Sequence, residues 1–195
     1  STKLNKNFKA IYKDFELIER QFEEGDEIEP KFFLPIIPTV LLNGSSGIAV
    51  GFATNILNRN PKTLIDCCLK VLDGKKFKEP APWINEFNGK WVQDAINNLS
   101  WTAKGSYEIL NTTDVHITEL PPGITYDKFE KHLTALEDNG WIQSYEDNRQ
   151  SNIDYKLKFT RKMLDEKKDL FHIGSWFKME ERQTENLTML DEHGK

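Results

Sequence analysis

Apolar residues recur at spacings of three and four near the start of the chain. They are Phe8, Ile11, Tyr12, Phe15, Ile18 and Phe22. Such spacing places side chains on one face of a helix, so the pattern predicts a helix over residues 8–22. The acidic run that follows, residues 23–27, contains Gly25 and predicts a solvated turn.

The stretch from 32 to 42 is apolar but is interrupted by Pro35 and Pro38. Proline cannot donate a ladder hydrogen bond, so we expect extended, irregular chain packed on a core rather than a central strand. Three glycines follow at close spacing, namely Gly44, Gly47 and Gly51. Glycine permits positive φ and a close approach of the backbone to a neighbour.

A helix is predicted to begin at Asn60, with Asn60 as the N-cap and Pro61 in the first helical position. Its expected buried face consists of Leu64, Ile65, Cys68, Leu69 and Leu72. Gly74 is expected to end the helix. The polar, proline-bearing linker over residues 75–82 is the clearest internal boundary.

The second half of the chain mixes strand and helix patterns. They predict a short helix over 91–99, strands over 106–111, 115–120, 141–145 and 155–159, and a helix capped by Thr125 and stopped at Asn139-Gly140. The inward face of that second helix is expected to be Phe129, Leu133 and Leu136. The order strand, strand, helix, strand, strand predicts an α+β sheet with helices on one side. From Arg161 onward a charged helical pattern follows, with Leu164, Leu170, Phe171, Trp176 and Phe177 as expected contacts.

Charge changes this picture at one place. With 26 basic and 31 acidic residues the net charge is −5, so bulk electrostatics would not draw the protein to nucleic acid or an anionic membrane. Yet no acidic residue lies between Pro30 and Lys62, where Lys31, Arg59 and Lys62 carry the only charges. The segment is therefore either an anion-facing loop or a tight, buried glycine turn.

Common catalytic and metal motifs do not fit this segment or the rest of the chain. A Walker loop needs lysine and Ser/Thr at its end, whereas Phe52 follows Gly51. Ser45 and Ser46 do not sit in a Gly-x-Ser-x-Gly elbow. The four histidines are scattered and the two cysteines are adjacent, so we expect no metal ligand in this chain. The five tryptophans could stack on bases, although their spacing favours core packing.

One sequence string carries a resemblance. The chain reads Phe33-Leu34-Pro35, then Ile37-Pro38, then Leu41-Leu42-Asn43-Gly44-Ser45-Ser46-Gly47-Ile48-Ala49-Val50-Gly51-Phe52-Ala53-Thr54-Asn55-Ile56. This resembles the breakage-reunion (A-type) subunit of type II DNA topoisomerases, and most of all its T-even phage members. The strong match covers residues 29–74. Weaker similarity continues at 115–121, which resembles the family's strand ending in Glu-hydrophobic-Pro.

The resemblance implies a domain order. Residues 1–28 would be the end of the winged-helix DNA-cleavage domain, and 29–78 the DNA-contacting segment and helix at the start of the tower domain. Residues 79–175 would form the α+β tower, with a mixed or antiparallel sheet flanked by helices. Residues 176–195 would begin the connection to a coiled coil.

The resemblance also implies the chemistry. In this family a tyrosine directly after an arginine attacks a DNA phosphodiester and holds it covalently until the strands are rejoined. The five tyrosines here follow Ile11, Ser106, Thr125, Ser144 and Asp154, never an arginine. The nucleophile is therefore expected just before Ser1, and this chain alone is expected not to cleave DNA.

Site residues follow from the same comparison. Ile48 occupies the place of the isoleucine that the family wedges between base pairs to bend the duplex. The expected DNA contacts around it are Asn43, Ser45, Ser46, Gly47, Arg59 and Lys62. Gyrase-like subunits usually continue Asn-Ile-Pro-Pro-His-Asn, whereas this chain has Asn55-Ile56-Leu57-Asn58-Arg59-Asn60. Arg59 is thus a candidate phosphate contact where the family has histidine.

The implied cofactors are Mg²⁺ and ATP, both on other domains or subunits of the holoenzyme. The implied partners are double-stranded DNA, the ATPase and metal-binding subunits, and a second copy that pairs through a more C-terminal region. No apolar run reaches the roughly 20 residues that cross a bilayer, and a cytoplasmic location, the host's for a virus, is expected. Two alternatives stay open: a DNA-binding or architectural module with no enzymatic parent, and a purely structural α+β domain with a buried glycine turn.

Overall fold

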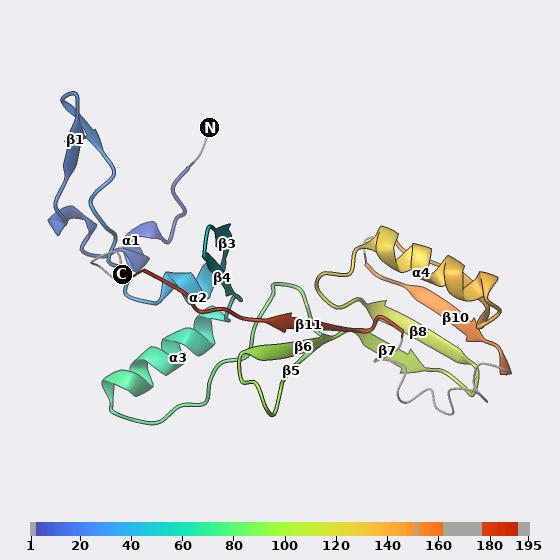
Figure 1. The fold of residues 1–195 in the computed structure, drawn as a ribbon. Helices are drawn as coiled ribbons and strands as arrows, with labels where there is room; N and C mark the ends of the chain where they lie inside the picture. The colour runs from blue at the N-terminus through green and yellow to red at the C-terminus, as the bar shows by residue number, and fades with distance from the viewer. Residues whose placement is uncertain (1–2, 151, 162–176, 191–195) are drawn as a thin grey trace. The chain divides into compact units, whose positions relative to one another are not determined.

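The computed structural model describes residues 3–150, 152–161 and 177–190. The chain forms two units (Figure 1). Residues 1–80 together with 188–195 make the first unit, and residues 81–187 make the second. The division between Pro80 and Ala81 lies inside the proline-bearing linker over residues 75–82.

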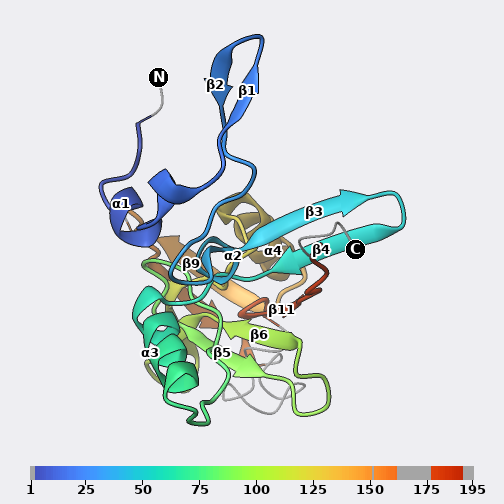
Figure 2. The same ribbon diagram turned by 90° about the vertical axis from the view of Figure 1, so that its left-hand side faces the viewer.

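The first unit is built from short helices and two separate β-hairpins. Its elements are α1 (Phe8–Ile11), a 3-10 turn η1 (Phe15–Leu17), β1 (Gln21–Glu23), β2 (Asp26–Ile28), α2 (Thr39–Asn43), β3 (Ser45–Ala49), β4 (Phe52–Ile56) and α3 (Pro61–Leu72). β1 pairs with β2 and β3 pairs with β4, both antiparallel (Figure 2). The apolar run is irregular chain as far as Pro38, as predicted, but Thr39–Asn43 is helical. The predicted packing of this run on a core is wrong for most of it, because Phe32, Phe33, Leu34 and Ile36 are exposed.

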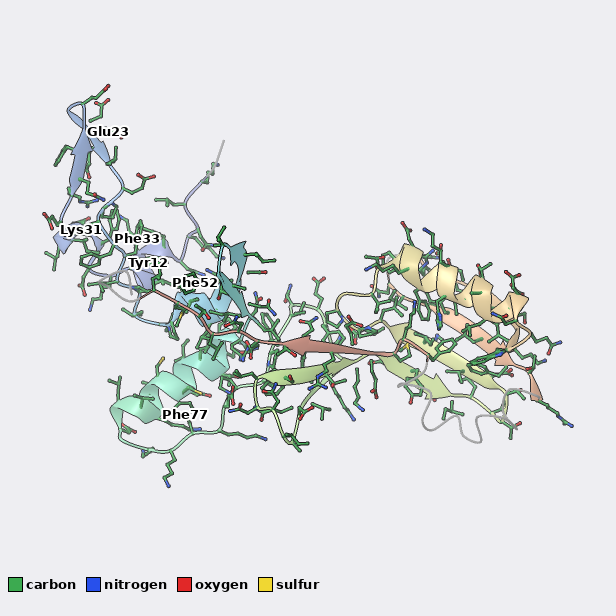
Figure 3. The ribbon with its side chains drawn as sticks, viewed as in Figure 1. Tyr12, Glu23, Lys31, Phe33, Phe52 and Phe77 are labelled. Carbon is green, nitrogen blue, oxygen red and sulfur yellow. The ribbon has the colours of Figure 1, made fainter. Side chains whose placement is uncertain are left out.

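The predicted continuous helix over residues 8–22 is wrong. The aromatic residues of that pattern pack on one another across a broken backbone, with Phe8 4.9 Å from Tyr12 and 5.3 Å from Phe15 between ring centroids. Tyr12 also meets Phe33 of the following segment (Figure 3). The Phe15 ring stacks on the same Phe33 ring. Ring packing across the chain therefore replaces helix continuity, and Phe22 belongs to β1. The predicted acidic turn is confirmed, because residues 24 and 25, both at positive φ, connect β1 to β2.

The limits of α3 are as predicted, but its buried face is not. The Asn60 side-chain oxygen accepts hydrogen bonds from the backbone N–H of Lys62 at 2.9 Å and of Thr63 at 3.4 Å. Gly74 follows the helix at positive φ. Of the expected apolar face, Leu64 is buried and Cys68 half-buried, whereas Ile65, Leu69 and Leu72 are exposed. The 3.6-residue period thus predicted the position of the helix but not which of its apolar side chains are buried.

The second unit holds the main core. Its larger sheet has the antiparallel strand order β7-β8-β10-β9, where the strands are β7 (Ser106–Ile109), β8 (Asp114–Glu119), β9 (Ile142–Asp147) and β10 (Tyr155–Phe159). Helix α4 (Tyr126–Asp138) packs on this sheet (Figure 1). The predicted order of strands and helix is confirmed. The core consists of Val115, Ile117, Leu120, Phe129, Leu133, Leu136, Ile142, Tyr155, Leu157, Phe159, Phe177 and Met179.

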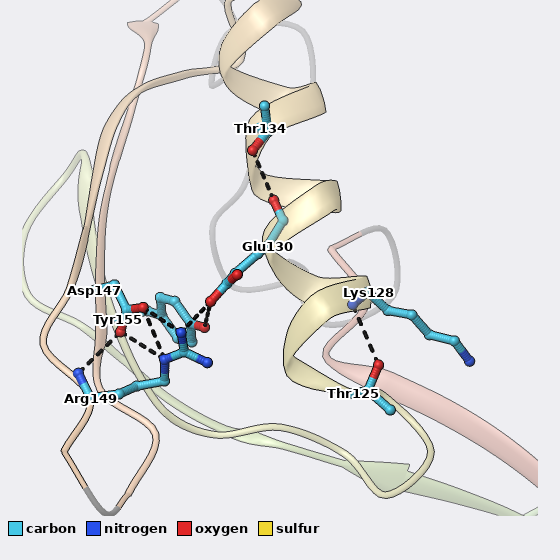
Figure 4. Close-up of polar contacts among 7 residues, drawn as sticks. All are labelled: Thr125, Lys128, Glu130, Thr134, Asp147, Arg149 and Tyr155. Carbon is cyan, nitrogen blue, oxygen red and sulfur yellow. Dashed lines mark hydrogen bonds and ion pairs between the residues drawn. The ribbon is translucent and has the colours of Figure 1, made fainter.

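Polar contacts fix the edges of that core (Figure 4). The Thr125 hydroxyl accepts from the backbone N–H of Lys128 at 3.4 Å, which is the predicted N-cap. The Arg149 guanidinium donates to both carboxylate oxygens of Asp147 and to Glu130, and it lies 5.2 Å from the centre of the Tyr155 ring. This guanidinium ties the loop after β9 to α4.

A second sheet has the strand order β11 (Glu180–Thr184), β6 (Ser100–Lys104), β5 (Lys90–Gln93). Two predictions are wrong in this region. The predicted helix over 91–99 is instead strand β5 (Lys90–Gln93) and a turn, in which an Asp94 carboxylate oxygen accepts from the N–H groups of Ile96 and Asn97. β5 pairs with β6 (Ser100–Lys104). The helical pattern predicted beyond Arg161 is wrong over Glu180–Thr184, which is strand β11 paired with β6. Phe177 is buried as expected, and Leu164, Leu170, Phe171 and Trp176 lie outside the described residues.

His132 on α4 gives the second unit a pH dependence. Its ring packs against Phe177 at 5.5 Å, and its Nε2 atom is buried with no hydrogen-bond partner among the described residues. Burial, and secondarily the charge of Lys178, lowers the pKa of His132 from the ordinary 6.5. A folded-state pKa below the unfolded one means that the unfolded chain binds the extra proton first. Stability is therefore complete above pH 6.5 and is lost as the pH falls below it.

We expect the urea midpoint of the chain to fall as the pH is lowered from 7.5 to 5.5. The free energy of unfolding should change by at most about 1.4 kcal/mol per pH unit from this one group. His132→Leu keeps an apolar side chain and removes the titrating group, so it should flatten this part of the profile. Equal slopes for the two proteins would show that other groups cause the loss.

Candidate nucleic-acid interface

The acid-free segment folds as the hairpin β3–β4, which we call the wedge hairpin, residues 45–56. Ser45 lies opposite Ile56 at its base and Ala49 opposite Phe52 at its outer end. Val50 and Gly51 make the connection, and Gly51 has a φ of +81°, a conformation that favours glycine. Within the described part of the chain, β3 and β4 form a separate two-stranded sheet.

The outer end of the wedge hairpin exposes large apolar side chains. Ile48 is 94% exposed, Val50 100% and Phe52 68%, whereas Ile56 at the base is 3% exposed. A contiguous patch of exposed apolar residues commonly marks an interaction surface. The alternative of a tight, buried glycine turn is therefore wrong, because the turn and the strands beside it are open to solvent.

The predicted polar contacts lie on the same hairpin. Asn43 ends α2 directly before it, and Ser45, Ser46 and Gly47 form the first half of β3, all of them exposed. Alternate residues of a strand share a face, so Ser46 lies on the side of Ile48. Lys62, in the first turn of α3, is also exposed. The fold thus joins five predicted residues in one continuous stretch and leaves Lys62 on the next element.

Arg59 differs from the rest of the predicted set. Its side chain is 3% exposed, and its Nη1 donates to the backbone carbonyl of Leu57 at 2.8 Å. A phosphate contact requires a guanidinium that reaches solvent. The structure therefore argues against the prediction that Arg59 touches DNA directly.

Sequence reasoning did not single out two residues of the exposed end, Val50 and Phe52. The signal was present: apolar residues at positions 48, 50 and 52 flank a glycine in a segment with no acid. A two-residue hairpin turn at Val50-Gly51 would have placed all three at the tip.

Among the described residues, no three His, Cys, Asp or Glu side chains come close enough to hold a metal ion. Tyr155 is buried in the core, and burial raises its pKa, which makes its phenolate harder to form.

Within the part of the chain that the structure describes, no helix combines the length and apolar character needed to cross a membrane.

Comparison with known proteins decides the family. The family model of the DNA gyrase/topoisomerase IV A-type subunit matches residues 1–195. The chain belongs to this topoisomerase family. Its similarity to the DNA topoisomerase medium subunit of Enterobacteria phage T4 is 36% identity over 99% of this chain and 44% of that protein. DNA topoisomerase 2 of Acanthamoeba polyphaga mimivirus is 33% identical over 77% of this chain and 12% of its own length.

The architecture agrees with the family assignment. The crystal structure of the Plasmodium falciparum topoisomerase II DNA-binding, cleavage and re-ligation domain superimposes with a TM-score of 0.84 and 26% identity, covering 99% of this chain and 27% of that one. The chain thus spans less than half the length of the topoisomerases that it matches. The mixed α+β fold predicted for this topoisomerase family is confirmed at that level.

Proposed function

We propose that this chain is a segment of the DNA-cleaving subunit of an ATP-dependent type II DNA topoisomerase, and that its wedge hairpin binds and bends the duplex to be cut. The observation that carries the proposal is Ile48, which is 94% exposed on an acid-free hairpin in a member of the topoisomerase family. An exposed β-branched side chain suits insertion between base pairs. Unstacking costs a few kcal/mol per step and is offset by the contacts that bent DNA makes.

The residues around Ile48 would hold the duplex without reading its sequence. Asn43, Ser45 and Ser46 carry short polar side chains that donate to phosphate oxygens. Gly47 keeps the strand thin beside the groove, and Lys62 neutralises a phosphate. The absence of acids from Pro30 to Lys62 removes repulsion from the DNA backbone. Arg59 is left out of this contact set because its side chain is buried.

The chemistry would be a transesterification by a tyrosine outside this chain. Its phenol oxygen forms a bond to phosphorus, the bond from phosphorus to the sugar oxygen breaks, and the sugar hydroxyl leaves with a proton. Rejoining reverses these steps. The donor set of the described residues does not fit Mg²⁺. Mg²⁺ and ATP would be bound by other domains or subunits of the holoenzyme.

The same proposal covers domains and partners. Residues 1–28 would end a winged-helix domain, 29–78 begin the tower, 79–175 complete it, and 176–195 lead toward a coiled coil. The partners would be double-stranded DNA, ATPase and metal-binding subunits, and a second copy of the same polypeptide. The site of action would be the cytoplasm in which the DNA lies.

A plasmid assay tests the enzymatic part. We expect the complete enzyme, assembled with its partner subunits, to relax supercoiled plasmid. We expect the 195-residue chain alone to leave no strand breaks and no protein bound to DNA after denaturation and protease treatment. Breaks made by the chain itself would place the nucleophile inside it. A complete assembly that binds plasmid without changing its topology would favour an architectural module.

A further inference from the structure

The base of the wedge hairpin is joined across its two sides. The backbone N–H of Arg59, just after the hairpin, donates to the carbonyl of Leu41 in α2 at 2.7 Å. Gly44, at the entry to β3, has a φ of +68°, and a Cβ there would lie 2.6 Å from the Asn58 side-chain oxygen and 2.7 Å from the Ile56 carbonyl. The incoming and outgoing chains therefore meet too closely for a side chain at position 44.

Arg59 holds this junction from inside. Its buried Nη1 donates to the carbonyl of Leu57, the residue directly after β4, and the next residue, Asn60, is the N-cap of α3. Burying a guanidinium is costly unless its donors are used, so the side chain is confined to the geometry that uses them. The Arg59 side chain thus braces the short segment that leads from β4 to the N-cap of α3, while its backbone N–H binds α2.

We infer that Arg59 is a positioning residue, which fixes the direction of the wedge hairpin relative to α2 and α3 and so places Ile48 against the DNA. The inference rests on the proposed function, because it matters only if Ile48 enters the duplex. Position matters more than charge here. Lysine is a point charge on a flexible stem and cannot replace the planar fork of a guanidinium.

The test compares variants of the complete topoisomerase on a short duplex labelled at both ends. Energy transfer between the ends reports the bent fraction at saturating protein, and the salt dependence of Kd reports phosphate contacts. We expect Arg59→Lys and Arg59→Met each to lower the bent fraction about threefold and to leave the salt slope unchanged. Lys62→Gln is the matched loss of an exposed cation. It should reduce the magnitude of the salt slope by about 0.9 and leave the bent fraction unchanged.

A direct phosphate contact predicts the opposite order. Arg59→Lys would then behave like the parent protein, and Arg59→Met would lower the salt slope by about 0.9 with the bend retained; either result overturns the inference. Thermal melting of both Arg59 variants shows whether each is folded. If one of them fails to fold, the bent fraction and salt slope of the other test the inference. Ile48→Ala distinguishes failure of the proposed function from failure of the inference about Arg59. Normal bending in Ile48→Ala contradicts the proposed function itself. Normal bending in the Arg59 variants alone contradicts only the inference.

Discussion

Ile48→Ala is expected to leave the protein folded and to abolish most of the bending of bound DNA. The side chain is 94% exposed, so its truncation removes almost no packing and should change the free energy of unfolding by less than about 0.5 kcal/mol. In the bent complex the same side chain would fill the gap between unstacked bases. Without it the cost of unstacking, a few kcal/mol, is no longer offset. DNA cleavage by the complete enzyme should fall about 100-fold, since strand and nucleophile are then misaligned.

The chain contains a matched control for this experiment. Ile96, in the turn after β5, is 99% exposed and belongs to the other unit. Ile96→Ala removes the same atoms from an equally exposed position, and we expect it to leave bending and cleavage unchanged. A loss of several kcal/mol in stability for Ile48→Ala, with normal bending, would instead identify Ile48 as a packing residue.

Phe129→Ala should have the largest effect on folding. The Phe129 ring is fully buried between α4 and the larger sheet, with its centre 5.3 Å from Tyr155 and 6.0 Å from Phe177 in edge-to-face geometry. Removing it leaves a cavity that a strand and helix cannot close, which costs about 3–5 kcal/mol. Because a domain of this size has a total stability of about 5–15 kcal/mol, the second unit should unfold at much lower urea concentration.

Urea titration followed by tryptophan fluorescence measures this loss. Phe129→Leu retains most of the volume and should cost less than half as much. Lys131→Ala, on the exposed side of α4, should leave the midpoint in place. Similar midpoints for Phe129→Ala and Lys131→Ala would contradict the assignment of Phe129 to the centre of the core.

Local signals predicted the parts of the fold that local interactions determine. Asn60 and Thr125 were recognisable as N-caps because the cap hydrogen bonds reach only two or three residues along the chain. The strands around Val115 and Leu157 were recognisable because one face of each is buried. Non-local pairing was not predictable: β5 exists because it pairs with β6, whose other edge is covered by β11 some eighty residues later.

The candidate site divides in the same way. The segment without acids and the place of Ile48 were readable from the sequence, because charge and resemblance are properties of a string. The exposure of Ile48 and the burial of Arg59 were not, since each depends on how neighbouring elements pack. Arg59 was a candidate phosphate contact by its charge and by its place in the resemblance, whereas its side chain is buried and its Nη1 donates to the carbonyl of Leu57.

The wedge hairpin also bears on how the protein behaves without DNA. Among the described residues, β3 pairs with β4 and with no other strand, and the outer half of the hairpin carries no charged side chain to repel a second chain. Natural sheets protect such edges with lysines, prolines or bulges, because an uncharged, apolar edge pairs readily with a second copy. The strand Ser45–Ala49 contains neither lysine nor proline, and its register with β4 is regular. The features suited to entering a duplex would thus also favour pairing between the wedge hairpins of two copies. Bound DNA would cover the hairpin and prevent this pairing.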